Sequence, residues 1–188
     1  MSTLLLIKHS LPEIRPELPS IEWTLSAEGR RRCFWLADRL RPYGISVLYS
    51  SPEPKALATA ALVSAELSVP CRRHPDLREN DRTGFPFLPN KEWMQRFHEF
   101  FDYPERICIG AESAVSAGHR FDRAVKEVLR EAHEQTTAIV SHGTVITLFL
   151  TRYNSLDAFE LWQSLSLPSF ICASAPAFEC REIVGYDG

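Results

Sequence analysis

The stretch LLLIKHS, residues 4–10, joins four aliphatic residues to a polar end. A short apolar run of this kind predicts a strand that is covered on both faces of a sheet. The segments ISVLYS (45–50) and TAIVS (137–141) show the same pattern and are also followed by polar residues. We therefore predict three buried strands, each with polar side chains just beyond its last residue.

Helical patterns lie between these strands. Ser26 can cap one helix, and Ser51-Pro52 can start a second, with Pro52 at its first helical position. A third pattern includes Phe121, and the segment TVITLFLTRY after His142 is apolar nearly all round. The alternation predicts an α/β fold of three layers, α/β/α, with a mostly parallel sheet and helices on both faces. The tail segments SFICAS and FECREIV are predicted to add two closing strands.

Residues 75–112 differ from the rest because they mix Pro, Gly, Asn and charged residues with aromatics. They hold one helix pattern, NKEWMQRFHEFFDY, whose aromatic residues recur at helical spacing and are predicted to serve packing. At this length a single domain over residues 1–188 is expected, with residues 75–112 as an excursion that covers a site.

The amino-acid composition limits the kinds of partner that we expect this protein to bind. Lys and Arg number 21 and Asp and Glu 24, so the net charge of 21 − 24 = −3 gives no pull toward nucleic acid or anionic membranes. The run Arg30-Arg31-Arg32 is interpreted as the solvated face of a helix, and no apolar run approaches the ~20 residues of a membrane span. Five cysteines without CxxC spacing indicate reduced, mostly buried thiols, and no secretion signal is recognised. We expect a cytoplasmic protein.

The polar strand ends are the candidate site, because ligands of open parallel sheets bind beyond the carboxyl ends of the strands. The three ends are Lys8-His9-Ser10, Ser50-Ser51 and Ser141-His142-Gly143-Thr144. One histidine at a strand end is more often structural than catalytic. Two of them, each followed by a small residue, favour a functional site.

Several chemistries lack their motifs in this sequence. There is no G-x-S-x-G, no H-E-x-x-H and no Gly-rich phosphate loop. We expect neither a metal nor a cofactor. The remaining groups are imidazoles, hydroxyls and lysines, which together suit a phosphate dianion.

Six short segments follow one another along the chain: LLLIKHS (4–10), LSAEG (25–29), SSPEPKALATA (50–60), LRE (77–79), Glu112-Ser113 with Arg120, and IVSHGTVI (139–146). In these segments and their order, the chain resembles the histidine phosphatase superfamily, the phosphoglycerate-mutase-like group. LLLIKHS stands for the family's strand followed by Arg-His-Gly, and LSAEG (25–29) for its LTxxG helix start. SSPEPKALATA (50–60) matches SSPxxRAxxTA, LRE (77–79) the acid motif, and Glu112-Ser113 with Arg120 a further one. IVSHGTVI (139–146) matches the final strand and His-Gly.

The resemblance implies a mechanism. His9 would attack phosphorus and carry a phosphohistidine, and His142 would contact the transferring group. Glu79 would protonate the leaving oxygen and then activate water; without the motif it would be interpreted as a solvated carboxylate in the charged stretch DLRENDR. The chemistry of histidine is consistent with this mechanism, because neutral imidazole, with a pKa of ~6.5, can act as a nucleophile at neutral pH.

The resemblance also implies a set of substrate-binding residues, although several depart from the family pattern. Lys8 and Lys55 occupy the positions of phosphate-binding arginines, and Ser10 replaces the glycine after the nucleophile. Gly143 and Thr144 complete the set. Lysine offers a point charge where arginine offers a planar fork, so the pocket is expected to be built differently from the family norm.

The function implied is hydrolysis of a small phosphomonoester without metal. One alternative is a phosphoglycerate-type mutase, although the ERxYG-like segment of those relatives is not found in LRENDRTGF (77–85). Another is a non-catalytic protein of the same fold that binds a phosphorylated ligand or protein, and the two lysines keep this alternative open. The sequence does not indicate the substrate or the oligomeric state.

Overall fold

The computed structural model describes residues 2–133 and 135–187. Within them the chain forms one sheet of six strands in the order β3-β2-β4-β1-β5-β6. Its strands are β1 (Ser2–Lys8), β2 (Val47–Ser50), β3 (Cys71–Arg73), β4 (Thr137–Ser141), β5 (Ser169–Ala175) and β6 (Glu179–Gly185). β1, β4, β2 and β3 pair in parallel, whereas β5 is antiparallel to β1 and to β6. The predicted mostly parallel sheet is confirmed.

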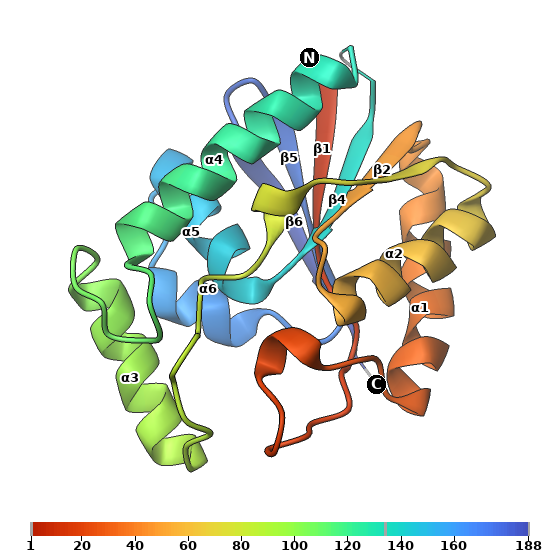
Figure 1. The fold of residues 1–188 in the computed structure, drawn as a ribbon. Helices are drawn as coiled ribbons and strands as arrows, with labels where there is room; N and C mark the ends of the chain where they lie inside the picture. Colours follow the sequence, from red (N-terminus) through yellow and green to blue (C-terminus); the bar gives the residue numbers. More distant parts are fainter. Residues whose placement is uncertain (1, 134, 188) are drawn as a thin grey trace.

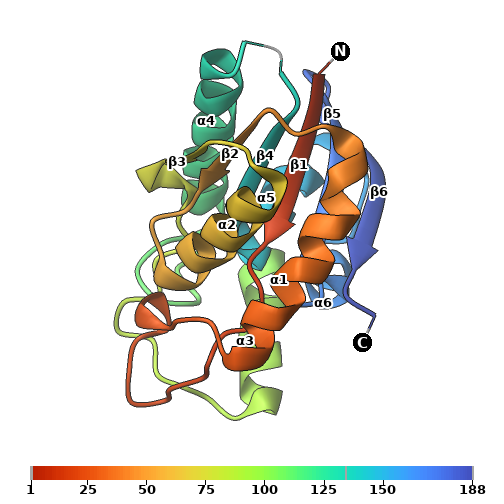
Figure 2. The same ribbon diagram turned by 90° about the vertical axis from the view of Figure 1, so that its right-hand side faces the viewer.

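Helices cover both faces of this sheet. They are α1 (Ala27–Leu40), α2 (Pro54–Leu67), α3 (Asn90–Asp102), α4 (Ala114–Glu131), α5 (Gly143–Tyr153) and α6 (Ala158–Ser164), with short 3-10 turns η1 (Ser20–Glu22), η2 (Arg41–Tyr43) and η3 (Pro75–Leu77). α1 and α2 lie on one face, and α4 and α5 on the other (Figures 1 and 2). The three-layer α/β/α architecture is therefore confirmed.

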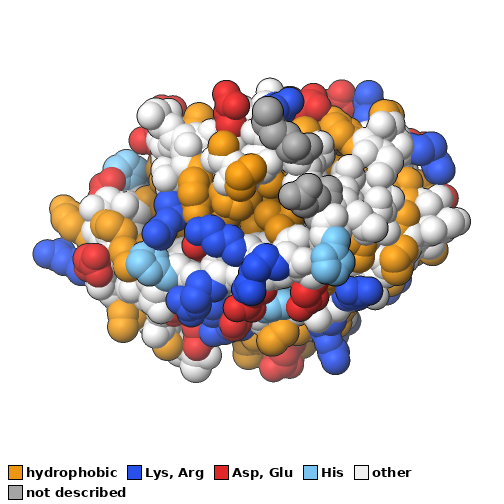
Figure 3. Space-filling model, turned by 90° about the horizontal axis from the view of Figure 1, so that it is seen from above, with side chains coloured by type: hydrophobic (Ala, Val, Ile, Leu, Met, Phe, Trp, Pro, Cys, Tyr) orange, Lys and Arg blue, Asp and Glu red, His pale blue; other side chains and the backbone are white. Residues whose placement is uncertain are grey.

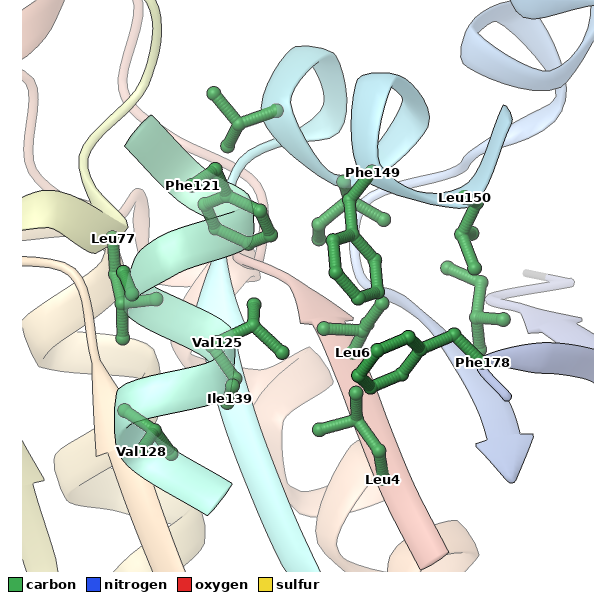
Figure 4. Packing of buried hydrophobic residues seen from close by; sticks show 14 of the residues in the cluster. Leu4, Leu6, Leu77, Phe121, Val125, Val128, Ile139, Phe149, Leu150 and Phe178 are labelled. Carbon is green, nitrogen blue, oxygen red and sulfur yellow. The ribbon is translucent and has the colours of Figure 1, made fainter. Parts of the chain in front are cut away.

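The sequence of β1 explains why it is the central buried strand. Successive side chains of a strand point to opposite faces. Leu4 and Leu6 accordingly pack in the core beneath α4 and α5, where they meet Phe149 (Figure 4). Leu5 and Ile7 pack against α1 and α2 on the other face. All four aliphatic side chains are fully buried.

The starts of α1 and α2 differ in how well they were predicted. Ser26 caps α1 as expected, because its hydroxyl accepts a hydrogen bond from Gly29 N. α2 begins at Pro54, so the predicted start at Pro52 is wrong. A residue that precedes proline disfavours the helical conformation, and Glu53 is extended, with φ −71° and ψ 139°. The helix can begin only after it.

The other long elements follow the prediction. α4, the buried α5 and the closing strands β5 and β6 lie where the patterns placed them. The short elements β3 and α6 were not predicted.

α3 lies within the 75–112 excursion and is anchored by its aromatic side chains. Phe97 and Phe100 are fully buried, and the Phe97 ring stacks on Trp162 of α6 with centroids 4.2 Å apart. Trp93 and Phe101 also belong to this cluster. The prediction that the aromatic stripe serves packing is confirmed, and its partner is α6.

The surface features agree with expectation in part. Arg30 and Arg31 are exposed on α1, as predicted for a solvated face. Arg32 departs from that prediction, because it is partly buried and donates to Leu167 O at 2.8 Å. The five cysteines are free thiols, as expected, but only Cys33 and Cys172 are buried, so the prediction that most of them are buried is wrong. At the end where β1 begins, basic and acidic side chains lie close together (Figure 3). Among the described residues, none of the helices has the length and hydropathy that crossing a membrane requires.

Candidate active site

The carboxyl ends of β1, β4 and β2 bring the predicted site residues together. These strands are adjacent and parallel, with Lys8 opposite Ser141 in β4. The backbone N–H of His9 donates to the Ser141 carbonyl, 2.9 Å away, so the pairing extends one residue beyond β1. Ser51 N donates likewise to Val140 O at 2.9 Å. The residues that follow the three strands therefore meet at one edge of the sheet.

His9 and His142 lie against each other at this edge. Their ring centroids are 5.1 Å apart with an edge-to-face angle of 64°. His9 Nδ1 lies 2.8 Å from the Ser10 carbonyl oxygen. Because a carbonyl can only accept, Nδ1 carries the hydrogen and Nε2 keeps a free lone pair. Burial, with the neighbouring His142 and Lys55 adding to it, holds the pKa of His9 well below its usual value.

His142 is fully buried and is held by two oxygens of the segment after β2. Its Nε2 lies 2.7 Å from Ser51 Oγ and 3.3 Å from Glu53 Oε1. Nδ1 has no hydrogen-bond partner among the residues that the structure describes. Burial lowers the pKa of His142 well below its usual value, and the charge of Lys55 adds to this effect. Its neutral ring therefore has one nitrogen held by the protein and one buried nitrogen without a partner among the described residues.

A buried carboxylate, Glu53, occupies the centre of this group. It is 4% exposed, and its Oε2 lies 2.5 Å from Lys55 Nζ. Lys55 also donates to Ser20 O at 2.7 Å. Burial lowers the pKa of Lys55, and the Glu53 charge opposes that decrease. Lys55 thus lies in the site as predicted, but its ammonium group is already paired.

Glu79 lies at the amino end of α5. Its carboxylate accepts hydrogen bonds from the backbone N–H groups of Thr144 and Val145, at 3.3 and 3.2 Å. Arg82 NH2 donates to Glu79 Oε2 at 3.0 Å. The amino end of a helix favours an anion because its N–H groups point outward and the helix dipole is positive there. The structure therefore brings Glu79 and Thr144 together at this point, as the motifs predicted.

Arg120 holds the backbone on which Glu79 lies. Its guanidinium forms a two-bond pair with Glu112, at 3.0 and 2.8 Å. Its other N–H groups donate to the carbonyls of Asp76, Arg78 and Glu79. All five donors of this buried arginine are therefore used, and its role is to position the loop that carries Glu79.

Lys8 passes over Gly143 toward α6. Its Nζ donates to Leu165 O at 2.6 Å. A Cβ at position 143 would lie 3.1 Å from Lys8 Cε, so a larger residue there would displace the lysine by a few tenths of an ångström. Burial lowers the pKa of Lys8 to about 8, although the charge of Glu79 opposes the effect. Lys8 and Gly143 thus lie side by side in the predicted pocket.

Ser10 connects β1 to the neighbouring helices. Its hydroxyl donates to Gly29 O at 2.7 Å, and its backbone N–H donates to Thr59 Oγ1 at 3.0 Å. Gly29 itself packs tightly, because a Cβ there would lie 2.0 Å from Leu11 O. These contacts give Ser10 a structural role, and its predicted contact with substrate remains a prediction.

Two site residues were missed from the sequence, Glu53 and Arg82. Arg82 reaches Thr144 Oγ1 as well as Glu79, with NH2 3.0 Å from that hydroxyl. The signal for Glu53 was its place within the SSPxxRAxxTA match, two residues before Lys55. The signal for Arg82 was its position three residues after Glu79, in a stretch whose charged residues were interpreted as solvated. Within the described ranges, no His, Cys, Asp or Glu side chains group as ligands of a metal ion.

Comparison with known proteins gives one family. The sequence pattern of the histidine phosphatase superfamily (branch 1) matches residues 9–170. The chain is 24% identical to phosphoserine phosphatase 1 of Hydrogenobacter thermophilus over 183 residues, which are 93% of this chain and 84% of the relative. It is 23% identical to the adenosylcobalamin/alpha-ribazole phosphatase of Escherichia coli over 143 residues, 73% and 70% of the two chains.

Solved structures share the fold at lower identity. A mycobacterial glucosyl-3-phosphoglycerate phosphatase aligns with a TM-score of 0.76 and 16% identity, and 100% of both chains is covered. The phosphoserine phosphatase of Entamoeba histolytica aligns with a TM-score of 0.78 and 15% identity, with 100% of this chain and 98% of that chain covered.

Proposed function

Because the chain belongs to the histidine phosphatase superfamily, we propose that it hydrolyses small phosphomonoesters through a phosphohistidine on His9. The observation that carries this proposal is the tautomer of His9. The Ser10 carbonyl fixes the hydrogen on Nδ1, so Nε2 keeps its lone pair, and burial keeps the ring neutral. A neutral imidazole with a free nitrogen is a competent nucleophile for phosphorus.

In the first step of this mechanism, His9 Nε2 forms a bond to phosphorus as the bond from phosphorus to the leaving oxygen breaks. Glu79, in its protonated form, gives its proton to that oxygen. In the second step Glu79 accepts a proton from water, whose oxygen attacks phosphorus as the P–N bond breaks. Phosphoryl transfer depends mainly on positioning and charge stabilisation. Lys8, His142, the N–H group of Gly143 and the hydroxyl of Thr144 are proposed to supply both.

The names of the relatives indicate the general class of substrate. Those compared above are phosphatases named for phosphoserine, for glucosyl-3-phosphoglycerate and for adenosylcobalamin or alpha-ribazole. All are phosphatases named for small molecules, so we propose a small phosphomonoester as the substrate here as well. No metal ion is required by the proposed steps.

The test is hydrolysis of an aryl phosphate by the wild-type chain and by His9→Ala, with a chelator present. We expect turnover in the wild type, no turnover in His9→Ala, and labelled phosphate on the wild-type protein after rapid quenching. His119→Ala is the matched control, because His119 is exposed on α4. Full activity of His9→Ala would contradict the mechanism. A wild type that binds phosphate but never turns over would support the non-catalytic alternative.

A further inference from the structure

We propose that Arg82 supplies the guanidinium that grips the phosphoryl group, a role that neither Lys8 nor Lys55 can fill. The inference rests on the proposed function, since it adds a catalytic residue to that reaction. The ammonium groups of both lysines are already bound by other residues. Lys8 Nζ donates to Leu165 O, and Lys55 Nζ is paired with Glu53. Neither presents the two parallel N–H groups with which arginine binds phosphate oxygens.

Arg82 reaches the centre of the site from the segment after Glu79. Its NH2 lies 3.0 Å from Glu79 Oε2 and 3.0 Å from Thr144 Oγ1. Arg82 therefore connects the loop that carries Glu79 to the first turn of α5. Its charge also contributes to lowering the pKa values of Lys8, Lys55 and His142, as expected for a cation close to all three.

The aromatic cluster beneath α3 fixes the direction of the guanidinium. Arg82 lies over the ring of Trp93, with 5.4 Å from Cζ to the centroid, and over Phe97 at 5.2 Å. Phe97 is in turn stacked on Trp162 of α6. A guanidinium packed on fixed rings loses less freedom when it binds an anion. The helix of the excursion thus orients the arginine that enters the site.

The donors of Arg82 are only partly used. Nε donates to Asn80 Oδ1 at 3.2 Å, and NH2 reaches Glu79 and Thr144. Within the described part of the chain, NH1 makes no hydrogen bond, and the side chain is 20% exposed. Arg120, by contrast, uses all five donors and lies buried. Of these two arginines, Arg82 keeps the two N–H groups of NH1 without a partner among the described residues, and Arg120 has no unused donor.

The experiment compares Arg82→Gln and Arg82→Lys with the wild type by two measurements. One is kcat/KM for an aryl phosphate and for an alkyl phosphate, and the other is the Kd of inorganic phosphate. A grip on the phosphoryl group predicts a loss of about a hundredfold in kcat/KM in Arg82→Gln, equal for both substrates. Phosphate binding should weaken about tenfold in Arg82→Gln, and Arg82→Lys should recover part of it. Arg72→Gln is the control, because Arg72 also lies over an aromatic ring, that of Tyr49, and contacts no site residue.

A different pattern would overturn the inference. If Arg82 only positions Glu79, the loss should be confined to the alkyl phosphate, and phosphate should bind with unchanged Kd. Changes within threefold in both measurements would also exclude the grip. The phosphate measurement needs no turnover. Should the wild type prove inactive, the proposed function fails, while weaker phosphate binding by Arg82→Gln would still support Arg82 as the phosphate ligand.

Discussion

Removing the ammonium group of Lys55 should destabilise the protein far more than removal of an ordinary surface lysine. Glu53 and Lys55 are 4% and 6% exposed, and their charged atoms are 2.5 Å apart. Lys55→Met leaves the Glu53 carboxylate buried beside His142 without its cation. Breaking a buried pair in this way costs about 3–5 kcal/mol. At 188 residues, where 1 kcal/mol corresponds to about 2–4 °C, the melting temperature should fall by about 6–20 °C.

The assay is urea unfolding of four proteins: the wild type, Lys55→Met, Glu53→Gln and the double variant. Glu53→Gln keeps an acceptor for Glu79 N, which donates to Glu53 Oε1 at 2.8 Å in the wild type, but it removes the charge. The double variant contains no unpaired charge from this pair. Its free energy of unfolding should therefore exceed the value expected from adding the two single losses, by about 0.5–3 kcal/mol.

Lys126→Met is the matched control. Lys126 Nζ lies 2.9 Å from Asp122 Oδ2, but its side chain is 48% exposed. Solvent weakens such a pair, so the loss should stay below about 1 kcal/mol. If Lys55→Met costs no more than Lys126→Met, or if the double variant is simply additive, the Glu53–Lys55 pair is not the buried unit inferred from its geometry.

Three further outcomes follow from the site. Glu79→Gln should slow hydrolysis of alkyl phosphates by ~10²-fold or more and that of aryl phosphates less, because good leaving groups need little protonation. Equal losses for both substrates in steady-state kinetics would contradict the role of Glu79 as the acid. Lys8 is protonated below its pKa of about 8, so kcat/KM should fall as pH rises through that value. A pH–rate profile of Lys8→Arg should lack this fall, since arginine keeps its charge, and an identical profile would assign the fall to another group. Arg120→Met should lower the free energy of unfolding by about 3–5 kcal/mol in urea, because it leaves Glu112 buried and unpaired; a loss below about 1 kcal/mol would contradict the positioning role.

The long buried elements and the two histidines could be predicted from sequence because their signals are local. An apolar run such as LLLI, residues 4–7, is covered whatever surrounds it, and parallel strands must end at the same edge. The meeting of His9 and His142 follows from that topology alone. The role of Glu79 could not be predicted from local pattern, since only the family motif distinguished this residue from a solvated carboxylate.

Glu53 and Arg82 could not be assigned from local pattern, because their environments are made by distant parts of the chain. Glu53 is buried only because Lys55 neutralises its charge and His142 encloses it, and His142 lies 89 residues later. Arg82 is ordered by rings of α3 and by Thr144 of α5. β3 is three exposed residues at a sheet edge, so it lacks the alternation that marks a strand.

The carboxylates that already bind the cations of the site affect how strongly free phosphate can inhibit turnover. Glu53 accepts from Lys55, and Glu79 accepts from Arg82 and from the amino end of α5. A free inorganic anion must compete with both carboxylates, whereas an ester can add the binding energy of its organic part. We therefore expect product inhibition by phosphate to be weak, so that hydrolysis continues when phosphate accumulates.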